Sequence, residues 1–409
     1  MSLPQRLSQR EFVAMMAMMF ASTALSIDAM LPALPAIAAE LTPDNMNKAQ
    51  LVVSVFFAGL GCGTLIAGPV SDAIGRKSSL LGCAAIYLVG AFVCTLAHSL
   101  EMLLLARFLQ GLGASGPRAV GMAMIRDMFK GRDMARIVSF VMMVFSLVPA
   151  VAPLLGQAVL HLGSWRLIFI AFIVFTVLIQ TWVTIRQPET LPVAARRPLN
   201  LSLLLKAGRE LLHHHTSVIS IACQALTSAC LLALLSSQQS IFEQRFHRAE
   251  TFPIWFAFIA LCSISGSFVN SQTVVKHGMR RVLVATYTAQ VALTLTVLVL
   301  NLTGVLPEST VFFLHILWSI GIFAMMGLSM GNLNALAMED MGHIAGFAAS
   351  VISAVSIVAS VVIAVPVGLA FNGTQIPLLI GVSVFSVLSL GLIQLIRIPD
   401  AQQRENAPP

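Results

Sequence analysis

Long runs of apolar residues, separated by short polar stretches, repeat along the whole chain. A helix needs about 20 apolar residues to cross the hydrocarbon core of a bilayer. Some segments contain Pro or Gly, which membrane helices tolerate where neighbouring helices satisfy the freed backbone groups. The pattern predicts twelve membrane-spanning helices, over residues 11–39, 48–70, 79–98, 100–124, 136–160, 165–185, 215–240, 252–275, 281–303, 309–335, 346–370 and 377–397.

Composition supports this interpretation and excludes several classes of function. The 409 residues are 57% hydrophobic and only 10% charged, whereas a soluble protein carries about 25% charged residues. We therefore expect an all-α membrane protein. The six cysteines lie in apolar stretches without CxxC spacing, so no disulfide framework or metal site is expected. Motifs of ATPases, zinc proteases and serine hydrolases are absent, so we expect neither an enzyme nor a cofactor.

The positive residues are distributed unevenly between the two sides of the predicted membrane. Both termini fall on one side, and this side carries 18 Lys and Arg residues against 4 on the other, with 2 more inside the fourth span. Because positive residues concentrate in cytoplasmic loops, both termini are predicted to be cytoplasmic. The net charge of +7 then reflects orientation in a lipid bilayer, and no nucleic-acid partner is expected.

The longest polar connection divides the chain in the middle. Residues 186–212 are rich in Pro and Arg and separate six predicted spans from six more. A linker between equal halves is typical of a duplicated transporter whose halves move against each other. We therefore predict a bundle over 1–185, a cytoplasmic linker over 186–212 and a second bundle over 213–409.

The stretch "GPVSDAIGRKSSL" follows the second span. Gly68 allows close helix approach, Asp72 can cap a helix, and Gly75 supplies a tight turn. The stretch resembles the signature loop of the major facilitator superfamily, G-x-x-x-D-x-x-G-R-K/R. This resemblance implies the major facilitator fold, with 12 transmembrane helices in two six-helix halves. It also implies a conformational latch made of Gly68, Asp72, Gly75, Arg76, Lys77, Arg126 and Asp127.

Further motifs resemble the Bcr/CflA-type drug:proton antiporters of this superfamily. They are "DAMLPALP" in the first span, "RFLQGLGAS" in the fourth, "IRDMF" after it, and "PAVAPLLGQ" in the fifth. The last is a degraded antiporter motif, in which Pro149, Pro153 and Gly156 remain as candidate residues. The resemblance covers the N-terminal half specifically and implies a multi-pass protein of the bacterial inner (plasma) membrane that works as a monomer.

Two charged residues deep in the first and fourth spans are predicted to couple transport to protons. Asp28 is the one acidic residue well inside a span, about 27 Å along a helix from Arg10. Arg107 lies at a comparable depth. We expect an Asp28–Arg107 pair, direct or through water, whose separation lets Asp28 take up a proton. The alternative is a structural ion pair that only orients two helices.

Arg118 follows Arg107 by 11 residues, which places the two on nearly the same helix face about 16 Å apart. Both are expected to point into a central cavity, where two positive charges against one negative would favour anionic or zwitterionic substrates. Alternatively, Pro117 bends the helix and Arg118 reaches the cytoplasmic interface or meets Glu339.

The remaining candidates for substrate binding are neutral or weakly basic polar residues inside the spans. Each could instead form helix–helix hydrogen bonds. With the charged residues above, the predicted substrate-binding set is Asp28, Arg107, Gln110, Arg118, Gln238, His315 and Asn332.

Together these features favour a proton-coupled exporter of small amphipathic molecules that works by alternating access. Its partners are a small-molecule substrate, protons and the bilayer. One alternative is a dedicated exporter of an endogenous anionic or zwitterionic metabolite, such as a siderophore. A more distant one is a membrane receptor or scaffold that transports nothing.

Overall fold

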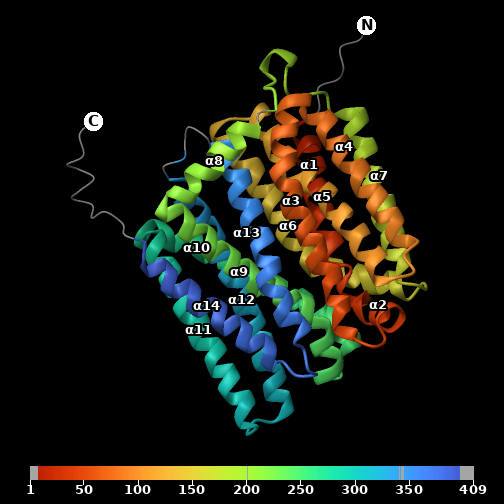
Figure 1. The fold of residues 1–409 in the computed structure, drawn as a ribbon, viewed down its shortest axis with the longest axis vertical. Coiled ribbons are helices and arrows are strands. Elements are labelled where there is room, and N and C mark those ends of the chain that lie inside the picture. The colour runs from red at the N-terminus through yellow and green to blue at the C-terminus, as the bar shows by residue number, and fades with distance from the viewer. Residues whose placement is uncertain (1–7, 200, 340, 342–344, 397–409) are drawn as a thin grey trace, which may run out of the picture.

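The computed structural model describes residues 8–199, 201–339, 341 and 345–396. In this part of the chain the regular elements are helices, and the long ones run side by side as a bundle (Figure 1). The α-helices are α1 Gln9–Asp28, α2 Leu34–Leu41, α3 Leu51–Ile74, α4 Arg76–Thr95, α5 Leu100–Met128, α6 Gly131–Leu160, α7 Arg166–Arg186, α8 Leu201–His213, α9 His215–Ser240, α10 Phe252–His277, α11 Met279–Thr303, α12 Glu308–Met338, α13 Ala345–Leu369 and α14 Ile376–Gln394.

Each of the twelve predicted spans corresponds to a long helix of this bundle. Eleven are long and apolar enough to cross a membrane. The twelfth, α5, is as long as the others at 29 residues but carries Arg107 and Arg118 within it. The protein is therefore an all-α membrane protein, as the hydrophobic pattern predicted.

The first span differs from its prediction as one continuous helix over 11–39. α1 ends at Asp28, a 3₁₀ turn covers Leu31–Ala33, and α2 begins at Leu34. Pro32 and Pro35 each stand in the first turn of the element that contains them. Proline has no N–H to donate and is accommodated best at such positions, so the two prolines divide the span.

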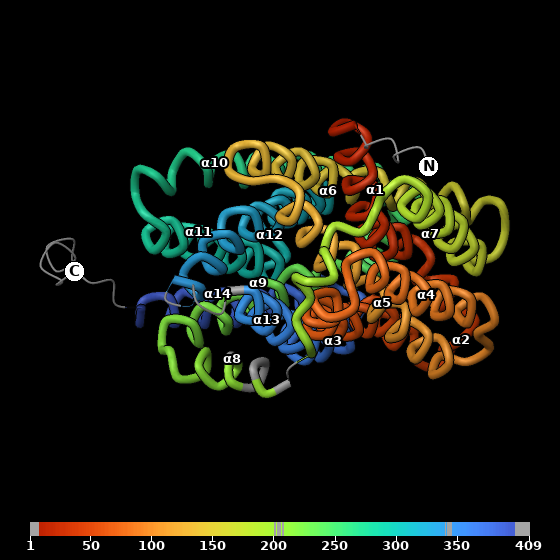
Figure 2. Tube along the Cα trace, turned by 90° about the horizontal axis from the view of Figure 1, so that it is seen from above, coloured from red at the N-terminus to blue at the C-terminus, as the bar shows by residue number. Residues whose placement is uncertain are grey.

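Helices from the two parts of the chain meet along two seams. Seen from above, the helices before residue 186 lie mostly on one side and the later ones on the other (Figure 2). α3 packs along α13, and α6 packs along α10. We call the end of the bundle with the α3–α4 turn, residues 186–199 and α8 the linker end, and the other the opposite end. The predicted linker contains α8, which the sequence analysis did not anticipate.

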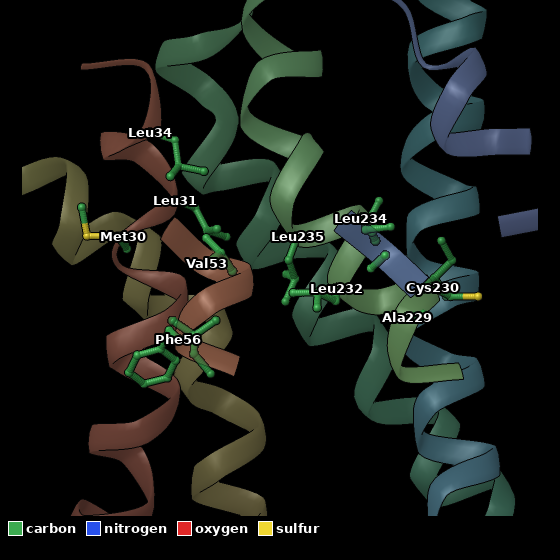
Figure 3. Packing of buried hydrophobic residues seen from close by; sticks show 14 of the residues in the cluster. Met30, Leu31, Leu34, Val53, Phe56, Ala229, Cys230, Leu232, Leu234 and Leu235 are labelled. Carbon is green, nitrogen blue, oxygen red and sulfur yellow. The ribbon is translucent and has the colours of Figure 1, made fainter. Parts of the chain in front are cut away.

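Apolar packing extends from one set of helices to the other. One cluster of buried residues includes Leu31, Val53 and Phe56 together with Leu232 and Leu235. Figure 3 shows the first group on the 3₁₀ turn and α3, and the second on α9. Toward the linker end, by contrast, α3, α5 and α13 surround a cavity.

Candidate functional site

A cavity of about 640 Å³ opens at the linker end between α3, α5, α8 and α13. Each long helix contributes a row of residues three or four positions apart, which is one face of an α-helix. These rows are Leu60, Thr64, Gly68 and Ser71 on α3; Arg118, Met122 and Arg126 on α5; and Gly346, Ser350, Ser353 and Ile357 on α13. A volume of this size is typical of a small-molecule site.

The cavity lining is basic. Among the residues that the structure describes, it includes five cationic side chains, Arg76, Arg118, Arg126, Arg197 and Lys206, and two acidic ones, Asp72 and Glu210. Arg76 already forms ion pairs with Asp72 and Asp127. The excess of positive charge in the lining therefore comes from the other four basic residues, Arg118, Arg126, Arg197 and Lys206.

Arg118 is exposed and lines this cavity. Among the residues that the structure describes, its guanidinium has no hydrogen bond and no ion pair, including none with Glu339. Arg118 lies ten residues before Met128, the end of α5, which corresponds to about 15 Å along the helix. It therefore lies well inside the bundle.

Arg107 does not line the cavity, which corrects the prediction that both arginines point into it. Its side chain is fully buried. The guanidinium donates to the Ser26 carbonyl at 3.3 Å, to the Val52 carbonyl at 3.1 Å and to Gln110 Oε1 at 2.7 Å. It also lies 4.3 Å from the centre of the Phe56 ring, a favourable position for a cation.

The end of α1 explains this position of Arg107. The last carbonyls of a helix have no partner within the helix and carry partial negative charge. Ser26 lies in the last turn of α1, which ends at Asp28. A cationic donor therefore satisfies the Ser26 carbonyl, and Arg107 fixes the end of α1 against α5.

Asp28 is the last residue of α1 and is only 5% exposed. We predicted an Asp28–Arg107 pair, direct or through water, and its direct form is absent because no ion pair joins the two. Within the described chain, the Asp28 carboxylate has no hydrogen bond or ion pair at all. The structure thus places a buried, unpaired carboxyl group beside the break in the first span.

The other predicted substrate-binding residues lie outside the cavity lining. Gln110 accepts from Arg107, and Gln238 Oε1 lies 3.3 Å from His315 Nε2. Asn332 donates to Asn270 Oδ1 at 2.8 Å. All four of the predicted residues are buried, and their contacts join helices or residues of one helix, which is the alternative that the sequence left open.

The residues of the predicted latch form a network at the linker end. Arg76 Nε donates to Asp127 Oδ2 at 2.9 Å, and Arg76 also pairs with Asp72. Lys77 Nζ donates to the Thr184 carbonyl at 2.7 Å. Gly75 has a φ of 105°, a conformation that favours glycine. Gly68 and Arg126 instead line the cavity.

Glu189 completes this network, and the sequence analysis did not identify it. Its carboxylate accepts from the backbone N–H groups of Arg76 at 2.9 Å and Lys77 at 3.1 Å. These N–H groups begin α4, where they lack partners within the helix. In the sequence, Glu189 is visible only as an acidic residue in a basic linker, and its spacing does not show which helix its carboxylate contacts.

Glu189→Gln is expected to lower the stability of the folded protein by about 0.5–1.5 kcal/mol, because the charge at the start of α4 is lost. The midpoint of thermal unfolding in detergent should fall by about 1–4 °C. Glu101→Gln is the matched control, since Glu101 lies in the first turn of α5 and is exposed. An equal shift in both variants would contradict a specific role for Glu189.

The remnants of the antiporter motif face the break in the first span. A side chain at Gly156 would collide with the Ala29 carbonyl, so α6 approaches the residue after Asp28 closely. Pro153 is buried near it and Pro149 is half-buried. α6 also packs against the 3₁₀ turn at Leu31–Ala33.

Neutral hydrogen bonds close the opposite end of the bundle. Ser237 donates to Gln50 Oε1 at 3.2 Å, and Asn47 donates to the carbonyls of Leu369 and Phe371 at 3.1 and 2.7 Å. In the described chain no ion pair at this end joins the helices before residue 186 to those after 213. These contacts were not predicted from the sequence.

The described residues also contain no group of His, Cys, Asp and Glu that could hold a metal ion.

Comparison with known proteins agrees with this architecture. An uncharacterized MFS-type transporter, YdgK of Bacillus subtilis (strain 168), is 29% identical over 349 residues, which cover 84% of this chain and 85% of YdgK. Multidrug resistance protein MdtL of Escherichia coli (strain K12) is 34% identical over 170 residues, 41% of this chain and 43% of MdtL.

Solved transporters have the same fold. The xylose transporter XylE from E. coli superposes with a TM-score of 0.71 at 12% identity, covering 97% of this chain and 99% of XylE. The human organic anion transporter MFSD10 gives a TM-score of 0.64 at 16% identity, covering 95% and 100%. The family model of the Major Facilitator Superfamily matches residues 13–365. The chain belongs to the Major Facilitator Superfamily.

Proposed function

We propose that this transporter is a proton-coupled exporter of the Bcr/CflA type, which moves small amphipathic molecules out of a bacterial cell by alternating access. Its likeness to MdtL supports drug export, although that match covers only part of each chain. The excess of Lys and Arg at the linker end supports a cytoplasmic location for this end and for both termini. A substrate would then enter the cavity from the cytoplasm.

The observation that carries the coupling proposal is the buried, unpaired carboxyl group of Asp28. An ionisable residue inside a membrane span is by default a functional candidate. Asp28 lies where α1 stops and where α6 approaches at Gly156. A movement between α1 and α6 would change the access of water to Asp28, and so would couple its protonation to the transport cycle.

The bundles 1–185 and 213–409 would rock against each other along the α3–α13 and α6–α10 seams. The hydrogen bonds of Asn47, Gln50 and Ser237 would break as the opposite end opens. Because these contacts are neutral, each costs only about 0.5–1.5 kcal/mol to break. The Arg76 network, which joins α3, α4 and α5 and holds the linker through Glu189, would keep this end of the first bundle together as it moves.

Asp28→Asn tests this function. In everted membrane vesicles with an imposed pH gradient, adding a transported compound should release protons, which a pH-sensitive dye reports. The compounds are chloramphenicol, ethidium and 1-naphthylacetate, which are neutral, cationic and anionic. We expect Asp28→Asn to reduce the substrate-induced proton flux at least about tenfold.

Asp44→Asn is the matched control, because Asp44 is exposed in the loop after α2. Its flux should stay within about twofold of the wild type. Coupled flux that survives Asp28→Asn would disprove the role of Asp28. Wild-type vesicles that respond to none of the compounds would favour a receptor or scaffold instead.

A second candidate function is the dedicated export of one endogenous anionic or zwitterionic metabolite, such as a siderophore. The specific observation that favours it is the basic lining of the cavity. The two functions differ in breadth: a dedicated exporter would respond to one chemical class in the same vesicle assay, whereas a drug exporter would respond to several.

A further inference from the structure

The cavity at the linker end is hollow because small residues line it at the levels where its three helices face one another. Gly68 on α3, Ala119 and Ala123 on α5, and Ala349 on α13 are all in the lining. Larger side chains at these positions would fill the space between the helices. The small residues on these faces of α3, α5 and α13 therefore leave the cavity open.

Polarity changes with depth in this cavity. Counted from the helix ends at the linker end, Arg118, Thr64 and Ser353 lie at similar depths of about 12–15 Å. Leu60 and Ile357 lie about one turn deeper, at roughly 18–21 Å. The inner part of the cavity is thus apolar, and a ring of polar groups that includes Arg118 surrounds it on the side of the entrance.

Among the described residues of the lining, Arg118 is the one charged side chain at that depth. The acidic lining residues are nearer the entrance: Asp72 is two residues from the end of α3 and pairs with Arg76, and Glu210 lies on α8. A cation inside a bundle without a counter-charge beside it favours the binding of an anion. An anionic group bound beside Arg118 would supply the missing counter-charge.

We propose that this cavity binds an amphipathic anion whose carboxylate or sulfonate accepts hydrogen bonds from Arg118, with its apolar part against Leu60 and Ile357. The Ser353 hydroxyl can donate to the same anionic group. Arg118 then determines which substrates the transporter prefers. The proposal deepens the proposed function by naming the substrate class, and it rests on that function only for the step of transport.

Three compounds with one naphthyl ring system test the charge preference directly. They are 1-naphthylacetate, the neutral 1-naphthylacetamide and the cationic 2-(1-naphthyl)ethylamine. Calorimetric titration of the purified full-length protein in phosphatidylcholine nanodiscs measures their dissociation constants. A charge-assisted hydrogen bond to a guanidinium should make the acid bind at least about tenfold more tightly than the amide, and the amine most weakly.

Arg118→Gln should bring the affinity for the acid to within about threefold of that for the amide, and Arg118→Lys should restore part of the preference. Arg132→Gln is the control, because it also removes one positive charge at the linker end but lies outside the cavity lining. It should keep the preference. Equal affinities of the wild type for acid and amide, or a preference that survives Arg118→Gln, would overturn the proposal.

The same titration in nanodiscs with phosphatidylglycerol distinguishes a small-molecule ligand from a lipid headgroup. Unchanged affinity for the acid supports a site for small anions. Competition by the anionic lipid would identify the headgroup as the occupant and overturn the proposal. Because binding is measured without transport, a charge preference without proton flux would refute only the proposed function, and flux without the preference would refute only this inference.

Discussion

Arg107→Met is expected to reduce substrate-induced proton flux at least about tenfold while leaving the preference of the cavity for 1-naphthylacetate unchanged. The wild-type guanidinium holds the Ser26 carbonyl at the end of α1 and the Val52 carbonyl on α3. Charge-assisted hydrogen bonds of this kind contribute about 1.5–3 kcal/mol each, and 1.4 kcal/mol corresponds to a factor of ten in an equilibrium. Without them, the end of α1 and the Asp28 carboxyl lose their fixed position.

This prediction separates the two arginines of α5 by experiment. Arg107→Met should impair flux but not anion binding, whereas Arg118→Gln should remove the anion preference. Arg132→Met serves as the control for loss of an exposed arginine. Thermal unfolding of each variant shows whether it is folded. If folded Arg107→Met lost the preference for the acid, then Arg107 would act on the ligand and not on the position of Asp28.

Arg107 and Arg118 have different environments, which the sequence alone does not predict. Helical periodicity predicts that Arg107 and Arg118 share a helix face, because an eleven-residue spacing returns to nearly the same direction. However, the same face of a helix can be buried by neighbouring helices at one depth and line a cavity at another. Arg107 lies where α1, α3 and α7 close around α5, and Arg118 lies where α3, α5 and α13 leave a hollow.

The fold itself was accessible from the sequence for a physical reason. Twelve apolar segments of sufficient length are each obliged to form helices in lipid, because unpaired backbone groups there cost several kcal/mol each. The break after Asp28 had a local signal in Pro32 and Pro35, but the length of the apolar run masked it. Glu189 and the contacts of Gln50 and Ser237 depend on partners distant in the sequence, which no local pattern specifies.

Close packing of α4 against α5 leads to the largest expected effect on stability. A Cβ atom at Gly90 would lie 2.5 Å from the backbone nitrogen of Gln110 and 2.8 Å from the Ala106 carbonyl oxygen. Both contacts are with backbone, which cannot rotate away as a side chain can. Small residues at such crossings let membrane helices approach closely. The approach also sets the position of α5 next to Arg107.

Gly90→Val is therefore expected to lower the free energy of unfolding by at least about 3 kcal/mol, a large fraction of the roughly 5–15 kcal/mol that proteins possess. The midpoint of thermal unfolding in detergent should fall by about 5–10 °C, and the folded fraction in size-exclusion chromatography should fall with it. The measurement needs a control for the intrinsic cost of valine in a helix, and α4 itself provides one.

Gly82 lies on the same helix, is exposed, and has nothing within 4 Å of the position that a Cβ would occupy. Gly82→Val makes the same change of residue and of helix propensity, so its midpoint should stay within about 2 °C of the wild type. The difference between the two variants then isolates the collision with α5. Equal midpoints would mean that α4 and α5 can separate at little cost, and that the close approach at Gly90 does not hold Arg107 and the end of α1 in place.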